Sequence, residues 1–162
     1  MDGRGTTETV QAGPTTDPRR SLLVGAIIGV GVMAAVDEIV FHQLLAWHHF
    51  YDRSTTRIGL LSDGLLHATE LLLLVAGFFL LADLRRRSTL HVRRGWAGFL
   101  LGAGGFQLFD GVIVHKVLRL HQIRYEVEIL PYDLAWNGFA VALLVAGVAL
   151  AMTGRTAAPA RS

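Results

Sequence analysis

Two stretches of the chain repeat an acid and two histidines at the same spacing. The first stretch is Gly25–His49, and Gly98–Gln122 follows it by 73 positions and aligns with it without a gap. The matching residues are Asp37 with Asp110, His42 with His115, and His48 with His121. Both stretches are apolar enough to lie in lipid, where an acid or a histidine is costly and usually serves a function. The repeat therefore predicts a polar site inside an apolar protein.

A third group of ionisable residues lies between the two copies, at Asp63, His67 and Glu70. At α-helical spacing His67 lies about 40° from Asp63, and Glu70 lies about 20° away on the other side. All three therefore share one face of a helix. A His-x-x-Glu pair resembles, in reverse order, the Glu-x-x-His spacing of metal sites in helical bundles. We expect this helix to dominate the site.

The same arithmetic separates Asp37 from His42 by about 140° on a regular α-helix. We therefore expect His42 to face the space between the helices and Asp37 to face a neighbouring helix or to support a ligand. The site is predicted to be centred on four residues, with Glu70 as a further ligand or a base. These four are His42, Asp63, His67 and His115, and the residues expected to support them are Asp37, Asp110, His48, His49 and His121.

Imidazole and carboxylate groups without sulfur suit copper, zinc or iron, and the chain contains no cysteine. Binding of one of these metals, for redox, assembly or hydrolytic chemistry, is the leading interpretation. A b-type haem held by paired histidines, for electron transfer, is an alternative. A proton relay and a purely structural, accessory role without a cofactor are the others. No nucleotide-binding, hydrolase or nucleic-acid motif is present, so whether the protein is an enzyme stays open.

The surrounding sequence predicts an all-α integral membrane protein. The 162 residues are 52% hydrophobic, with a mean hydropathy of +0.44, and four apolar runs are long enough to span a bilayer. The predicted helices cover residues 21–45, 58–84, 95–118 and 133–152. They form one transmembrane domain, 21–153, a four-helix bundle of two tandem, parallel helical hairpins, 21–84 and 95–153. Residues 1–20 are predicted to be a disordered cytoplasmic tail, and 154–162 a second cytoplasmic tail.

Arginine predicts the orientation of the bundle. The two tails and the loop at 85–94 carry ten of the fifteen Lys and Arg residues. The positive-inside rule therefore places both termini and this loop in the cytoplasm. Six of the seven histidines then lie in the outer half, and only His91 lies on the cytoplasmic side.

Three segments carry a resemblance to a known family: DEIVFHQLLAWHH at 37–49, SDGLLHATE at 62–70 and FDGVIVHKVLRLH at 109–121. They resemble an uncharacterised bacterial family of four-helix integral membrane proteins, defined by a domain of unknown function. The chain departs from that pattern at Glu38, where the family usually has Gly, and at Gln122, where it usually has His. The resemblance implies a bacterial cytoplasmic membrane and no established activity. It also implies, as partner, a respiratory or copper-handling membrane complex.

Overall fold

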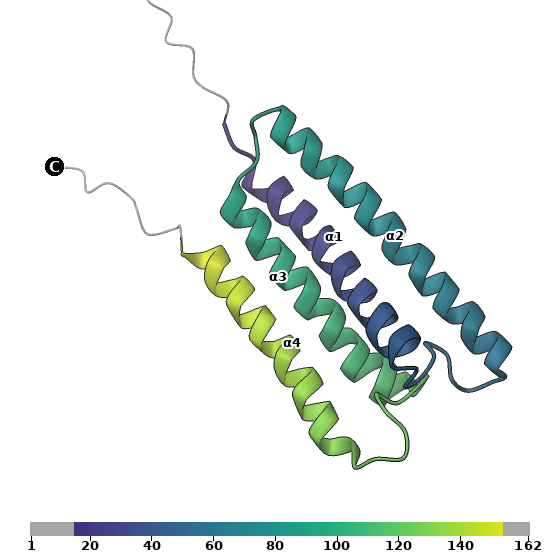
Figure 1. The fold of residues 1–162 in the computed structure, drawn as a ribbon. Helices are drawn as coiled ribbons and strands as arrows, with labels where there is room; N and C mark the ends of the chain where they lie inside the picture. The colour runs from purple at the N-terminus through teal and green to yellow at the C-terminus, as the bar shows by residue number, and fades with distance from the viewer. Residues whose placement is uncertain (1–14, 154–162) are drawn as a thin grey trace, which may run out of the picture.

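The structure, a computed structural model, describes residues 15–153 and contains four long helices (Figure 1). The first helix, α1 (Pro18–Asp37), continues into a π-helical segment, η1 (Glu38–Leu44). The second is α2 (Thr56–Arg86). The third, α3 (Val92–Leu108), likewise continues into a π-helical segment, η2 (Phe109–Leu118), and the fourth is α4 (Ile129–Met152). The predicted all-α class is confirmed.

The helices form a row in which α1 and α3 are central (Figure 1). Among the described residues, α2 packs only against α1 and η1, and α4 packs only against α3 and η2. The central spans are 44% and 50% buried, whereas those of α2 and α4 are 11% and 17% buried. The two outer helices therefore present most of their apolar side chains to the surroundings.

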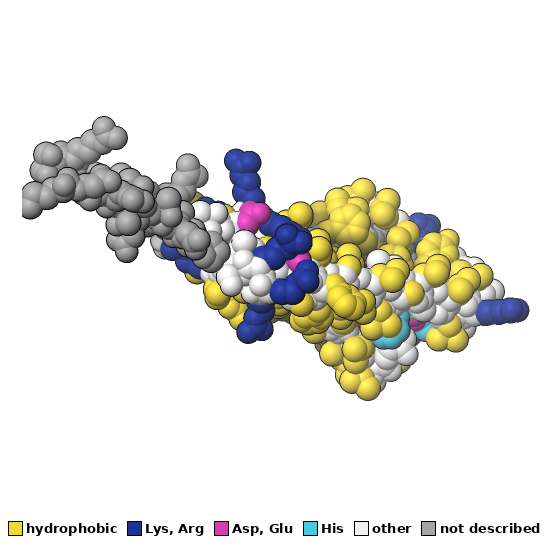
Figure 2. Space-filling model, turned by 90° about the horizontal axis from the view of Figure 1, so that it is seen from above, with side chains coloured by type: hydrophobic (Ala, Val, Ile, Leu, Met, Phe, Trp, Pro, Cys, Tyr) yellow, Lys and Arg dark blue, Asp and Glu magenta, His cyan; other side chains and the backbone are white. Residues whose placement is uncertain are grey.

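Those surroundings are lipid. The four helical spans have 27, 31, 27 and 24 residues and mean hydropathies between 1.5 and 2.1, which suits the hydrocarbon thickness of a bilayer. Figure 2 shows hydrophobic side chains over the flank and most of the visible Lys and Arg side chains toward one end. We call this the arginine end; it contains the start of α1 and α3 and the end of α2 and α4. The opposite end, with η1, η2 and the loops 45–55 and 119–128, is the loop end.

Glycine allows α1 and α3 to touch along their length. A Cβ atom on Gly25 or Gly29 would overlap a backbone carbonyl oxygen of α3. A Cβ atom on Gly98 or Gly102 would overlap one of α1. Such small-xxx-small pairs are how membrane helices approach closely, and this contact brings η1 and η2 together at the loop end.

The helix boundaries differ from the prediction at both ends of the chain. Asp17 caps α1 by accepting a hydrogen bond from the Arg20 backbone N–H at 2.9 Å, and Pro18 occupies the first turn, where a missing N–H costs nothing. Residues 18–20 are thus helical rather than part of a tail; residues 1–14 and the predicted tail at 154–162 lie outside the described part. The fourth helix begins four residues before the predicted 133, with Pro131 in its first turn.

Candidate metal centre

The two π-helical segments change which side chains are neighbours. In a π-helix each turn holds about one residue more than in an α-helix, so residues five apart become adjacent. His42 Nε2 accordingly lies 3.8 Å from Asp37 Oδ2, and His115 Nε2 lies 3.0 Å from Asp110 Oδ2. The expected angle of about 140° between Asp37 and His42 assumed α-helical spacing. The structure instead places the acid beside the histidine in both segments.

His48 and His121 come from the two loops that cover the loop end, and each bonds to the other's loop. His48 Nδ1 lies 2.9 Å from the carbonyl oxygen of Ile123, and His121 Nδ1 lies 2.8 Å from that of Phe50. A carbonyl oxygen only accepts, so both Nδ1 atoms donate and, in the neutral rings, both Nε2 atoms carry a lone pair. His48 Nε2 has no partner, whereas His121 Nε2 lies 2.9 Å from His115 Nε2. The two rings stack with their centroids 4.3 Å apart and their planes at 9°.

Burial also keeps these two imidazoles neutral. It lowers the pKa of His48 from its ordinary value of 6.5 to about 2, with further lowering from the neighbouring histidines. It lowers the pKa of His121 to about 4, although Asp110 acts in the opposite direction. A neutral imidazole whose Nδ1–H is held by a carbonyl oxygen is the usual state of a histidine that binds a metal through Nε2.

One group of possible ligands is formed by Asp110, His115 and His121. The Nε2 atoms of the two histidines are 2.9 Å apart. The carboxylate oxygens of Asp110 lie 3.0 Å from His115 Nε2 and 3.7 Å from His121 Nε2. Ligands about 2.0–2.1 Å from a tetrahedral metal are roughly 3.3 Å from one another. The 3.0 Å contact is made by Asp110 Oδ2 and the 3.7 Å contact by Asp110 Oδ1. The two Nε2 atoms and the Asp110 carboxylate group therefore lie close to the spacing that three ligands of a tetrahedral site require.

A second group is formed by Glu38, His42 and Asp63. His42 Nδ1 lies 2.7 Å from Glu38 Oε2 and 3.3 Å from Asp63 Oδ1. Asp63 is held in place by the loop, because it lies 2.6 Å from His49 Nδ1 and accepts a 2.7 Å hydrogen bond from the Phe50 backbone N–H. A third group, His42 with His48 and His121, joins the first two.

We call these eight residues the histidine cluster: Asp37, Glu38, His42, His48, Asp63, Asp110, His115 and His121. None is more than 5% exposed. Several of their polar atoms have no hydrogen-bond partner: both Asp37 carboxylate oxygens, His42 Nε2, His48 Nε2 and His115 Nδ1. Buried polar atoms are almost always paired, so unpaired ones of this chemistry fit a site that takes a metal.

The structure brings most of the predicted site residues together. His42, Asp63 and His115 lie in the cluster. Three residues predicted to support them, Asp110, His48 and His121, offer donor atoms directly, and His49 contacts Asp63 as a supporting residue would. Glu38 also contributes an oxygen; the sequence had indicated it as a departure from the family pattern that adds a carboxylate near the site.

Two predicted residues, His67 and Glu70, lie apart from these groups. They pair with each other, His67 Nδ1 to Glu70 Oε1 at 2.6 Å, and the His67 side chain is 49% exposed. Neither belongs to any of the three groups of possible ligands found among residues 15–153.

Comparison with known proteins supports the membrane assignment. Residues 24–154 match a family described as "Predicted membrane protein (DUF2243)". No curated protein and no solved structure gives a significant match. Since the matched region includes α1 from Val24 onward, the other three helices and the whole histidine cluster, the chain belongs to this membrane protein family of unknown function.

Proposed function

We propose that this membrane protein binds a transition-metal ion in the histidine cluster, through Asp110, His115 and His121, with His48 as a fourth ligand. The observation that carries the proposal is the convergence of Asp110, His115 and His121. The two Nε2 atoms lie 2.9 Å apart, Asp110 Oδ2 lies 3.0 Å from His115 Nε2, and Asp110 Oδ1 lies 3.7 Å from His121 Nε2. His48 adds a buried Nε2 atom without a partner, on a ring stacked against that of His121. Three imidazoles and one carboxylate suit zinc, copper or iron.

The protein's own residues would set the properties of the bound ion. The carbonyl oxygens of Ile123 and Phe50 orient His48 and His121. Loss of a supporting contact of this kind typically weakens metal binding by about 10–100-fold. A bound ion would supply Lewis acidity or redox chemistry, and the buried walls would exclude water from it. Metal handling, redox chemistry and oxidase assembly are the functions consistent with this site. Haem has less support, because the imidazoles of His42, His48, His115 and His121 pack on one another, with ring centroids 4.3–6.2 Å apart in the contacting pairs, and these pairs leave no room for a macrocycle.

The location of the site within the cell is part of the proposal. The arginine end contains the loop 85–94, and we infer from the positive-inside rule that this end, with both termini, faces the cytoplasm of a bacterium. The histidine cluster then opens toward the outer side of the cytoplasmic membrane. We also infer that the two hairpins are copies of one ancestral hairpin. Aligned positions of the repeat supply Asp37 with His42 and Asp110 with His115, each pair at a π-helical turn.

The metal content of purified protein tests the proposal. We expect wild-type protein in detergent to hold zinc, copper or iron stoichiometrically, and His115→Ala and His121→Ala to bind it at least about tenfold more weakly. His67→Ala removes an imidazole that lies outside the three groups and is the matched control. It should leave the metal content unchanged. Because the chain has no cysteine, thiolates cannot contribute to the signal.

Two other results would contradict the proposal. If His115→Ala and His121→Ala retain full metal content, the site as described is wrong. If wild-type protein takes up no metal after reconstitution and these variants only lower the folding yield, the cluster is structural. An intense Soret band with stoichiometric iron would instead support the haem alternative.

A further inference from the structure

We propose that the histidine cluster holds a second metal ion, bound by Glu38, His42 and Asp63, so that the protein contains a two-ion centre. This inference rests on the proposed function. The two groups of possible ligands, Glu38–His42–Asp63 and Asp110–His115–His121, share no residue. Each gathers its donor atoms within 4.8 Å of one another, so each can serve an ion of its own.

The position of His42 favours two neighbouring ions. Its Nδ1 faces Glu38 and Asp63, while its Nε2 is buried without a partner. His42 also belongs to the group that includes His48 and His121, so the two ligand sets adjoin. Paired ions in metalloproteins are typically about 3.5–4 Å apart, and adjoining ligand sets of this kind are what such a pair requires.

Charge gives a second, independent argument. The cluster contains four carboxylates, Asp37, Glu38, Asp63 and Asp110, and each is at most 2% exposed. Buried charges are costly unless they are paired. When ionised, the four carry a charge of −4, which two divalent cations would balance and one would leave at −2. Asp37, whose two oxygens have no partner, would act through its neighbour His42.

The two ligand sets are unequal, so the two ions should differ. The position that aligns with Glu38 in the second half is Gly111, and Asp133, which aligns with Asp63, pairs with Lys116 at 2.5 Å. Of these two groups, only Glu38–His42–Asp63 therefore has two carboxylates and one imidazole. Oxygen-rich sets favour harder ions such as Mn²⁺ or Fe²⁺, whereas imidazole-rich sets favour zinc or copper. We infer a harder ion at Glu38, His42 and Asp63.

Titration of the metal-free protein with Mn²⁺ and Zn²⁺ tests this inference. We expect wild-type protein to bind two ions per chain, Glu38→Gln to lose the Mn²⁺ site and keep one Zn²⁺, and His115→Ala to do the reverse. Glu70→Gln is the matched control, because Glu70 is also a buried carboxylate but pairs with His67 outside the three groups. It should still bind two ions.

The outcomes separate the two proposals. One ion per chain that is lost in His115→Ala and retained in Glu38→Gln overturns the second ion and leaves the proposed function standing. No ion in wild-type protein overturns both. Because Glu38→Gln can also fail to fold, wild-type protein loaded with Mn²⁺ alone gives a second test by electron paramagnetic resonance. One Mn²⁺ per chain is expected to stay bound when one Zn²⁺ per chain is added, and displacement of the Mn²⁺ by the first Zn²⁺ would contradict the inference.

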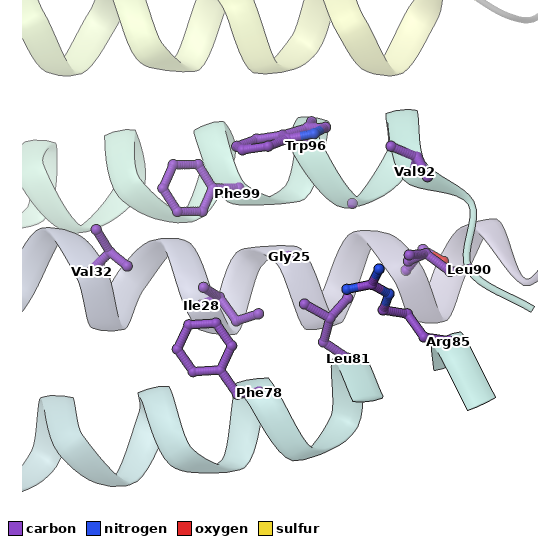
Figure 3. A pocket seen from close by; sticks show the side chains of 12 residues that line it. Gly25, Ile28, Val32, Phe78, Leu81, Arg85, Leu90, Val92, Trp96 and Phe99 are labelled. Atoms are coloured by element: carbon purple, nitrogen blue, oxygen red, sulfur yellow. The ribbon is translucent and has the colours of Figure 1, made fainter. Parts of the chain in front are cut away.

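A different observation, at the arginine end, supports a separate proposal. An apolar groove of about 580 Å³ lies between α1, α2 and α3 (Figure 3). Its walls include Ile28, Phe78 and Phe99, and Gly25 forms part of its floor. Arg85 also lines it and is the one charged residue in the lining. In the view of Figure 3 its guanidinium lies between Leu81 and Leu90.

We propose that this groove holds an acyl chain of an anionic phospholipid whose phosphate binds Arg85. The neighbouring Arg86 and Arg87 pair with Asp83, at 2.7 and 2.9 Å, whereas within residues 15–153 no acid pairs with Arg85. The guanidinium is thus available for a phosphate, which it binds well through two parallel hydrogen bonds. Basic residues between membrane helices on the cytoplasmic side are a known setting for anionic headgroups.

Native mass spectrometry in mixed phosphatidylglycerol and phosphatidylcholine tests this second proposal. Wild-type protein should retain phosphatidylglycerol in preference to phosphatidylcholine, and Arg85→Gln should reduce that preference several-fold. Arg86→Gln removes an equal charge from the same helix, but from an arginine already paired with Asp83, and should keep the preference. Equal loss in both variants would show only a general charge effect and would overturn the site, as would a wild-type protein without preference.

Discussion

Replacing Gly98 by alanine should unfold or severely destabilise the protein, by about 3 kcal/mol or more. A Cβ atom at this position would overlap the carbonyl oxygen of Leu22. Both atoms belong to helix backbones, so no side-chain rotation can relieve the clash and α1 and α3 must separate. Since this contact holds η1 against η2, the histidine cluster should open as well. Thermal unfolding in detergent, followed by scanning fluorimetry, measures the effect.

Gly105→Ala is the matched control, because Gly105 lies on the same helix and a Cβ atom there meets nothing within 4 Å. Alanine is the better helix former by about 1 kcal/mol, so this variant should unfold at the same or a slightly higher temperature than wild-type protein. Equal unfolding temperatures for Gly98→Ala and Gly105→Ala would show that α1 and α3 do not pack as the structure has them.

Acidification should destabilise the metal-free protein between pH 6.5 and pH 5. The folded state lowers the pKa of His48 to about 2 and that of His121 to about 4, whereas both are about 6.5 in an unfolded chain. In this range the unfolded state binds more protons, so the stability is complete above pH 6.5 and falls as the pH falls. Over these 1.5 pH units each histidine costs about 2 kcal/mol, or about 4 kcal/mol together.

The measurement is the unfolding temperature in the presence of a chelator at pH 7.5 and at pH 5. The His48→Gln/His121→Gln double variant has neither imidazole and should lose most of the pH dependence. An unfolding temperature for wild-type protein that is the same at both pH values would mean that these two rings are not buried as neutral groups. With metal present the dependence should be steeper, because protons compete with the metal for the same nitrogen atoms.

The sequence was informative about the helices and less so about the site. Runs of apolar residues specify membrane spans through their length alone, so the four helices were predicted with boundary errors of a few residues. The α-helical spacing also predicts that Asp63, His67 and Glu70 share one helix face, but this angle takes no account of their separation along the helix axis. Asp63 and Glu70 are seven residues, about 10 Å, apart along the axis. Only Asp63 therefore lies at the level of the loops and reaches His42.

The sequence by itself determined the all-α membrane fold, the glycine pairs of α1 and α3, and the alignment of Asp37, His42 and His48 with their counterparts. These are local properties, set by composition and spacing. Only the tertiary structure decided which atoms meet. The π-helical turns place His42 beside Asp37, and His48 reaches the carbonyl oxygen of Ile123, a residue 75 positions away. A contact between two loops depends on how the helices beneath them pack. The spacing of residues within one helix does not predict that packing.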